Sequence, residues 1–256
     1  MRILYLGNNR LGWQVLRWLR QRDEEIVALV LHPERRRAYG EEILRAAALP
    51  ADRVFSGAEL RRGEVRQAIA ALSPEIGLSV LFGYVLAPEL LRLFPRRVVN
   101  LHPALLPYNR GSYPNVWSIV DRTPAGATLH YMDEGIDTGE IIAQQEVEVE
   151  PIDTGESLYR KLEHASFELF RRTWPKLRTG DVSPRPQSRE GGTVHRVDEV
   201  EAIDAIDLDA SYRARDLIDV LRARTFPPHR GAYFTAGGRR IYVRIQLEYG
   251  EGAGEP

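Results

Sequence analysis

The sequence predicts an α/β fold, with a mostly parallel sheet flanked by helices and a small C-terminal α+β subdomain. Over the first 150 residues, short β-branched runs alternate with amphipathic segments, the pattern of parallel strands joined by helical crossovers. A chain of 256 residues can bury a sizeable core. A stretch rich in proline, glycine and polar residues, TGDVSPRPQSREGG, then precedes a shorter final part. We therefore predict a Rossmann-like domain at 1–180, a linker at 181–195 and a subdomain at 196–256.

The first predicted element is the strand RILYLG, after which Leu11, Val15, Trp18 and Leu19 recur at helical spacing. The glycine loop between them, LGNNRLG, lacks the G-x-G-x-x-G spacing of dinucleotide-binding proteins, so a plain strand-to-helix turn is favoured. Four elements follow in chain order: a strand at 25–33, a helix at 64–72, a strand at 76–83 and a short helix with proline at its start at 88–94.

The fourth strand of this series, RVVNLHP at 97–103, places Asn100 and His102 near its carboxyl end. The later predicted elements are a helix at 115–121, two strands within 126–151 around the tight loop Gly135 to Gly139, and a long helix at 155–177. The C-terminal part has a helical pattern at 211–223 and strand candidates at 233–236 and 240–249.

The charge balance argues against a strong electrostatic attraction to nucleic acid. Thirty-five basic residues face thirty-six acidic ones. Residues 196–256 hold nine arginines, no lysine and eleven carboxylates, which gives 9 − 11 = −2. An RNA-binding role for this part is therefore disfavoured.

The chain has no cysteine, which excludes disulfides and thiolate nucleophiles and fits a reducing cytoplasm. The amino terminus reaches a glycine at position 7, too soon for a signal peptide, and no apolar run approaches the roughly 20 residues of a membrane span. We expect a cytoplasmic protein with no membrane partner. No structural metal is expected, because the histidines outside NLHP show no ligand spacing: His32, His130, His164, His195 and His229.

Asn100 and His102 are two apart at a strand end, so in an extended chain their side chains point to the same side. A carboxamide can donate to a developing oxyanion, and a neutral imidazole can accept a proton near pH 7. Asp137 lies in a loop that another strand delivers to the same sheet edge, where its carboxylate can orient an imidazole. The alternative for Asp137, and more so for Asp133 and Glu134, is that the side chain only stabilises the turn.

The segments NLHPALLPYNRG and GATLHYMDEGIDTGEIIAQ resemble the folate-dependent formyltransferase family in sequence and spacing. The resemblance covers roughly residues 1 to 180 and implies formyl transfer from N10-formyltetrahydrofolate, as co-substrate, to a primary amine. It implies that Asn100, His102 and Asp137 are the catalytic set. It also places the folate near the segment LFGYVL, with the following cofactor-binding residues: Phe82, Gly83, Tyr84, Asp133 and Ile136.

LPYNRGSYPNVWSI and the later TFPPHRGAYF are similar to the sugar-nucleotide N-formyltransferases, which act on dTDP- or UDP-linked amino sugars. This implies an amino-sugar substrate, a dTDP-amino-dideoxyhexose first, and a homodimer. The implied substrate-binding residues are Tyr108, Asn109, Arg110, Gly111, Tyr113, Asn115 and Trp117. The residue types alone leave alternatives open. Arg110 could bind a phosphate or pair with a neighbouring carboxylate, and Asn109 and Asn115 could bind hydroxyls or cap a turn or helix. Trp117 lies in a helical pattern and could belong to the core.

Three alternatives stay open. Methionyl-tRNA formyltransferases resemble the chain at ALLP, but a basic tRNA-binding domain is not expected from the acidic C-terminal part. The enzyme that formylates glycinamide ribonucleotide resembles the second segment, yet its glycine-serine phosphate loop is replaced by GNNRLG. A folate- or nucleotide-binding protein without catalysis is the alternative from another class, and the presence of all three catalytic residue types disfavours it.

Overall fold

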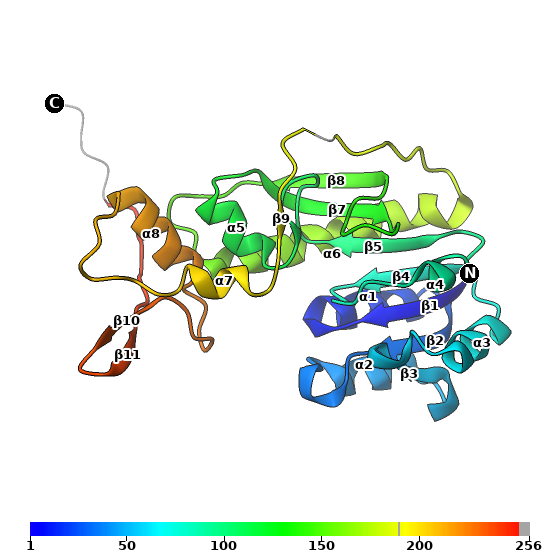
Figure 1. The fold of residues 1–256 in the computed structure, drawn as a ribbon. Coiled ribbons are helices and arrows are strands. Elements are labelled where there is room, and N and C mark those ends of the chain that lie inside the picture. Colours follow the sequence, from blue (N-terminus) through cyan, green and yellow to red (C-terminus); the bar gives the residue numbers. More distant parts are fainter. Residues whose placement is uncertain (189, 251–256) are drawn as a thin grey trace. The chain divides into compact units, whose positions relative to one another are not determined.

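A computed structural model describes residues 1–188 and 190–250. The chain divides into two compact units (Figure 1). The first unit comprises Met1–His102, Ala127–Gln145 and Ala165–Ser188, and the second comprises Pro103–Gly126, Glu146–His164 and the described residues after position 189. The last six residues of the predicted subdomain lie outside the described residues. The boundaries predicted at 180 and 196 stay a prediction.

A seven-stranded sheet organises the first unit, in the order β3-β2-β1-β4-β5-β7-β8. The pairs β1–β2, β1–β4, β2–β3 and β4–β5 are parallel, whereas β5–β7 is antiparallel. The predicted α/β class with a mostly parallel sheet is confirmed. The strands are β1 (Arg2–Gly7), β2 (Glu25–Leu31), β3 (Val54–Ser56), β4 (Ile76–Val80), β5 (Val98–His102), β7 (Ala125–Tyr131) and β8 (Ile141–Val147).

The central strand β1 is buried on both faces: Ile3, Leu4, Tyr5 and Leu6 have no exposed surface. A parallel strand covered on both faces reads as a continuous apolar run, which is why RILYLG is recognisable from sequence. The short strand β3 was not predicted, because three half-buried residues carry almost no periodic signal.

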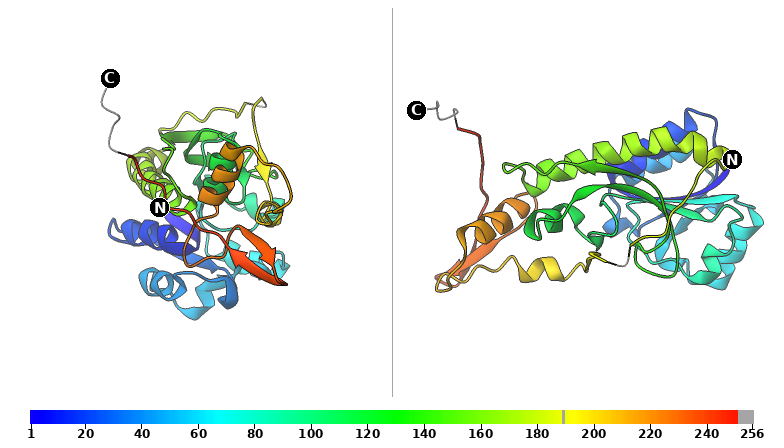
Figure 2. Two further views of the ribbon diagram at one scale, coloured as in Figure 1. Left: turned by 90° about the vertical axis from the view of Figure 1, so that its left-hand side faces the viewer. Right: turned by 90° about the horizontal axis from the view of Figure 1, so that it is seen from above.

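The helices of the first unit lie where the sequence predicted helical segments, except the helix at Gly40–Ala47, which was not predicted. In α1, the predicted apolar positions Leu11, Val15, Trp18 and Leu19 are all buried. Figure 2 shows α6 as one long helix, whose first part, through His164, belongs to the second unit and whose remainder belongs to the first. The helices are α1 (Asn9–Arg20), α2 (Gly40–Ala47), α3 (Gly63–Ala71), α4 (Pro88–Leu91) and α6 (Gly155–Thr179), with 3-10 turns η1 (Glu34–Arg36), η2 (Ala51–Arg53) and η3 (Gly57–Glu59).

The second unit has a core of its own, built from one face of α5, the first part of α6 and single residues of α7 and α8. Its elements are α5 (Pro114–Val120), α7 (Glu199–Ala202), α8 (Ala214–Ala223), the parallel pair β6 (Arg110–Gly111) and β9 (Val194–His195), and the antiparallel pair β10 (Tyr233–Ala236) and β11 (Arg239–Tyr242). The strand predicted at 240–249 is wrong beyond Tyr242, where the backbone makes no further sheet pairing.

No helix within residues 1–188 and 190–250 has the length and apolar character needed to cross a membrane.

Candidate active site

The switch from parallel to antiparallel pairing in the sheet places four polar side chains in one buried cluster. Asn100 and His102 lie on β5, and the antiparallel register pairs Asn100 with His130 of β7. Asp137 comes from the loop between β7 and β8. The exposed fractions are 9% for Asn100, 6% for His102 and 1% for His130, and 14% for the Asp137 side chain. The cluster, all within the first unit, is the candidate catalytic centre.

Asp137 is the common partner in this cluster. Its Oδ1 accepts a hydrogen bond from Asn100 Nδ2 at 3.2 Å and lies 3.4 Å from His130 Nε2. Its Oδ2 lies 3.7 Å from His102 Nε2, close enough for charge pairing but longer than a direct hydrogen bond. The predicted set Asn100, His102 and Asp137 therefore lies in one place, with a second histidine at its centre.

The protonation of neutral His130 follows from its contacts. Nδ1 lies 2.8 Å from the Tyr131 carbonyl oxygen, which can only accept, so Nδ1 carries the hydrogen. Nε2 then has a lone pair and accepts from Asn100 Nδ2 at 3.2 Å. Asn100 thus directs one N–H to His130 and the other to Asp137, which fixes its amide with the NH2 group facing the carboxylate.

The loop that carries Asp137 is held tightly by its own chain. Asp137 has φ +52°, a left-handed conformation that aspartate tolerates better than most residues. The Gln187 side chain donates to the backbone oxygens of Asp137 and Gly139, both at 2.7 Å. A Cβ on Gly139 would lie 1.8 Å from the Tyr131 oxygen, so only glycine fits there.

The Asp133 carboxylate accepts from the Gly135 N–H, at 3.0 Å, and from the Thr138 hydroxyl. Asp133 thus has the turn-stabilising contacts that the sequence left open.

The predicted folate segment lies in the same unit, directly after β4. Phe82 is buried, Tyr84 is half-buried and Gly83 is exposed at the tip of a tight turn in which Tyr84 N donates to the Phe82 oxygen at 3.0 Å. Ile136 is 43% exposed in the Asp137 loop. Phe82, Gly83 and Tyr84 are therefore placed at the carboxyl end of β4, on the edge where open α/β sheets bind ligands.

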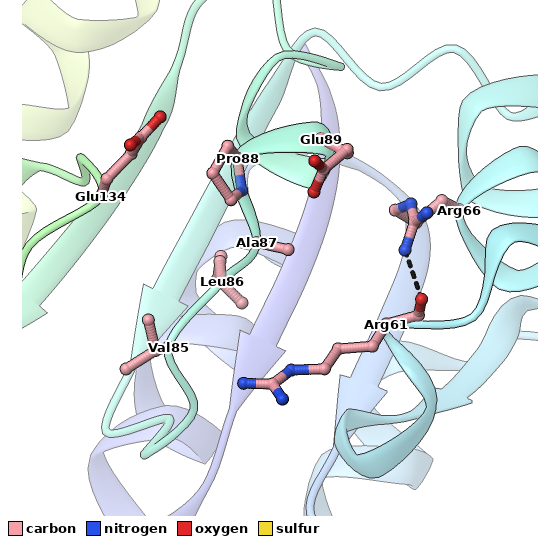
Figure 3. Close-up of a pocket in the computed structure, with 8 residues that line it drawn as sticks. All are labelled: Arg61, Arg66, Val85, Leu86, Ala87, Pro88, Glu89 and Glu134. Atoms are coloured by element: carbon pink, nitrogen blue, oxygen red, sulfur yellow. Dashed lines mark hydrogen bonds between the residues drawn. The ribbon is translucent and has the colours of Figure 1, made fainter.

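An open pocket of about 560 Å³ continues from this segment (Figure 3). Its floor is apolar, and two arginines stand on one side of it, with two glutamates also in the lining. Arg66 donates to the Arg61 backbone oxygen at 2.5 Å, and within the described residues neither guanidinium makes an ion pair of its own. The lining residues are Arg61, Arg66, Val85, Leu86, Ala87, Pro88, Glu89 and Glu134.

The predicted substrate-binding residues all belong to the second unit, and three of them are buried in it. The Asn109 amide donates to the Ser118 and Thr123 hydroxyls at 2.9 and 2.8 Å. Asn115 donates to the Gly155 oxygen at 2.9 Å, and Trp117 stacks on the His195 ring at 4.1 Å. These contacts hold the shape of the segment 108–117 from inside.

The other four residues of that set are accessible. Tyr108, Arg110 and Gly111 are half-buried, and Tyr113 is 42% exposed. Gly111 has φ +85°, and a Cβ there would lie 2.3 Å from the His195 oxygen. The segment thus offers Tyr108, Arg110 and Tyr113 as side chains able to contact a ligand.

Two residues that contact Asp137 were missed from the sequence. His130 was set aside because it has no ligand spacing with other histidines, and Gln187 falls in the predicted linker. The available signal for His130 was the alternation in GATLHYM: on a strand paired with β5, every second residue faces the same side as Asn100.

The Formyl transferase family matches residues 1–173, two thirds of the chain. The chain belongs to this family. The expectation of a formyltransferase is thus confirmed. In this formyltransferase, residues 199–249 also match a family described as the N-formyltransferase dimerization C-terminal domain.

Relatives of this formyltransferase act on different amines. It is 32% identical to a methionyl-tRNA formyltransferase of Myxococcus xanthus over 239 residues, which cover 90% of this chain and 74% of that one. It is 36% identical to a dTDP-4-amino-4,6-dideoxyglucose formyltransferase of Mycobacterium tuberculosis over 153 residues, which cover 59% of this chain and 65% of that one.

Solved structures extend the similarity to nearly the whole chain. A 4-N formyltransferase from Francisella tularensis superposes with a TM-score of 0.83 at 26% identity, covering 97% of this chain and 98% of that one. The formyltransferase PseJ from Anoxybacillus kamchatkensis, in complex with UDP-4,6-dideoxy-4-formamido-L-AltNAc and tetrahydrofolate, has a TM-score of 0.58 at 29% identity, covering 79% and 89%.

Proposed function

We propose that this formyltransferase moves the formyl group of N10-formyltetrahydrofolate to the primary amine of a nucleotide-linked amino sugar, with a dTDP-amino-dideoxyhexose as the expected acceptor. The observation that carries the proposal is the buried cluster of Asn100, His102 and Asp137 in a member of this family. The sugar acceptor is supported by the similarity to the dTDP-4-amino-4,6-dideoxyglucose formyltransferase and to PseJ, whose complex holds a UDP-linked formamido sugar.

In the proposed reaction, the sugar amine attacks the formyl carbon and a C–N bond forms as the carbonyl becomes an oxyanion. His102 accepts the proton that the amine loses. Asn100 donates an N–H to the oxyanion, a contact whose loss costs roughly 3 to 4 kcal/mol in comparable transition states. The intermediate then collapses, the bond to N10 breaks, and N10 takes up a proton, which leaves tetrahydrofolate and the formamido sugar.

The contacts of Asn100 couple these events. Both N–H groups of its amide already have partners, at Asp137 and at His130. When one N–H turns to the oxyanion, the carboxylate of Asp137 loses a donor and pairs more strongly with His102 as that ring becomes an imidazolium. Asp137 therefore stabilises the charge on His102 at the moment when the oxyanion forms.

For the co-substrate we propose that the pterin lies at the turn of Phe82, Gly83 and Tyr84, with Asp133 and Ile136 beside it. Tetrahydrofolate in the PseJ complex supports folate as the carrier. The folate tail, a benzoyl group followed by glutamate carboxylates, has the chemistry of the adjoining pocket, where an apolar floor leads to Arg61 and Arg66. Among the substrate residues we propose that Arg110 contacts the sugar-nucleotide phosphates and that Tyr108 and Tyr113 pack on the sugar or base.

Methionyl-tRNA is the second candidate acceptor, favoured by the Myxococcus relative. The net charge of −2 over residues 196–256 disfavours it, because binding to RNA phosphates needs basic surface. We further propose a cytoplasmic homodimer that associates through the C-terminal part, in keeping with the dimerization family that matches residues 199–249.

A matched panel of acceptors tests the proposed function. The purified protein would be given N10-formyltetrahydrofolate with dTDP- and UDP-linked amino sugars, glycinamide ribonucleotide and methionyl-tRNA in parallel, and the absorbance change on folate release would be followed. We expect turnover with a sugar nucleotide at least about a hundredfold above the other acceptors in kcat/KM. Turnover confined to methionyl-tRNA or glycinamide ribonucleotide would reject the acceptor, and folate binding with no turnover on any amine would reject the enzyme.

A further inference from the structure

The turn formed by Phe82, Gly83 and Tyr84 is contacted by a histidine that follows a different strand. His32 follows β2, whereas the turn follows β4, and β1 lies between these strands in the sheet. The Gly83 N–H donates to His32 Nε2 at 3.3 Å. The imidazole lies edge-on to the rings of Phe82 and Tyr84, with centroids at 5.0 and 5.1 Å. A single side chain thus contacts all three residues of the turn.

The turn has a conformation that needs external support. Leu81, just before it, has φ +50°, which is unfavourable for leucine. The rings of Phe82 and Tyr84 also press on Gly57, where a Cβ would lie 2.7 Å from Phe82 and 2.9 Å from Tyr84. Between the glycine on one side and the imidazole on the other, the two rings have little freedom.

The hydrogen bond fixes the protonation state of His32. An imidazole nitrogen accepts from an N–H only when it carries a lone pair, so Nε2 must be unprotonated. Burial lowers the pKa of His32 from its ordinary 6.5, and the positive charge of Arg36 lowers it further. Arg37 also donates its Nε hydrogen to the His32 backbone oxygen at 3.1 Å, and Tyr84 is the titratable group on the turn. Burial and the charge of Arg36 both favour the neutral ring.

We propose that neutral His32 is a positioning residue for the folate co-substrate: it holds the 82–84 turn in the shape that receives the pterin, and its protonation releases the turn. The inference rests on the proposed function, because it assigns a folate to this turn. Because the Gly83 N–H donates to His32, the pterin must form its hydrogen bonds with other groups of the segment.

The sign of the pH effect follows from the acceptor role. Above the lowered pKa, His32 is neutral and the turn is held, so folate affinity is at its full value. As the pH falls through that pKa, Nε2 gains a hydrogen that faces the Gly83 N–H. The hydrogen bond between Gly83 and His32 is then lost. One proton competes with one folate, so the Kd rises by at most about tenfold per pH unit on the acid side.

The proposed role of His32 is tested with three variants and one inert folate. Binding of 5-formyltetrahydrofolate would be measured by calorimetry from about pH 7.5 to about pH 5, a range that spans histidine titration. His32→Gln keeps an acceptor oxygen near the Nε2 position at every pH, whereas His32→Leu keeps bulk and removes the acceptor. His164→Gln, at an exposed position on α6, is the matched control.

We expect the wild type and the control to lose affinity in acid with the same slope. His32→Gln should bind within about threefold of the wild type at pH 7.5 and lose that slope, and His32→Leu should bind weakly throughout. The inference is overturned if His32→Gln keeps the acid slope, or if it binds as weakly as His32→Leu while remaining folded.

A folate-free measurement separates this inference from the proposed function. With nitrogen-15-labelled glycine, the Gly83 amide signal should shift with pH in the wild type and stay constant in His32→Gln. If that signal titrates but no folate binds at any pH, the pH-dependent contact between His32 and the turn is supported and folate is rejected as the co-substrate. A Gly83 signal that does not change between about pH 7.5 and about pH 5 would overturn the role of His32 directly.

Discussion

At the scale of single residues, Asp137 is the centre of the candidate site. It receives one N–H of Asn100 and lies within 4 Å of two imidazoles, and its backbone oxygen is held by Gln187. A carboxylate fixed in this way can influence both Asn100 and His102, the proposed oxyanion donor and base. The backbone of Asp137 is in the left-handed region, which aspartate tolerates, and the Gln187 contact helps to hold it there.

Removing the donor or the base should affect the chemical step and spare binding. For Asn100→Ala and His102→Asn we expect kcat to fall at least about a hundredfold with KM for the sugar nucleotide near the wild-type value, the pattern of groups that act in the transition state. Steady-state kinetics against His164→Asn, an exposed histidine, provides the comparison. Near-full turnover in either variant would remove that residue from its assigned role.

At the scale of elements, sequence patterns predicted strands that are buried on both faces and helices with one apolar face. They failed where a short element has little periodicity, as in β3, and where an apolar segment has no partner strand, as after Tyr242. The role of His130 depends on the register between β5 and β7, which no local pattern encodes. That Asn100, His102 and Asp137 lie together was predictable, because they come from two short segments with distinctive chemistry.

The pocket beside the 82–84 turn makes a prediction of its own. With Arg61→Ala and Arg66→Ala combined, we expect the KM for N10-formyltetrahydrofolate to rise about three- to tenfold, and more for a folate with three glutamates than for one, because each added carboxylate loses an attraction. Added salt should reduce the difference between the wild-type KM values for the folates with three glutamates and with one. The control is Arg45→Ala, an exposed arginine on α2. Equal effects on both folates would place the tail elsewhere.

At the scale of the whole molecule, two family matches divide the chain much as its composition does: residues 1–173 carry the transferase match and residues 199–249 the dimerization match. The C-terminal match includes large apolar side chains on the surface of the chain, among them Leu208, Ile218 and Ile241. We propose that these side chains contribute to the association surface of the dimer, in keeping with the dimerization match.

We expect light scattering to give a mass of twice the 29.1 kDa of one chain. Ile241→Glu, on β11 with 45% of its surface exposed, should shift the protein toward monomer, because an unpaired charge in an apolar interface costs several kcal/mol. Gln67→Glu, which adds the same charge on an exposed position of α3, should leave the mass unchanged. A monomeric wild type, or a dimer that tolerates Ile241→Glu, would contradict this interface.

The antiparallel pairing of β5 with β7 has a further consequence for how this enzyme can vary. Side chains on a strand alternate between faces, so inserting or deleting one residue between Ala127 and Tyr131 would turn His130 away from Asn100 and put an apolar neighbour in its place. A one-residue change of length within β7 is therefore expected to break up the cluster even when all four of its residues remain in the sequence.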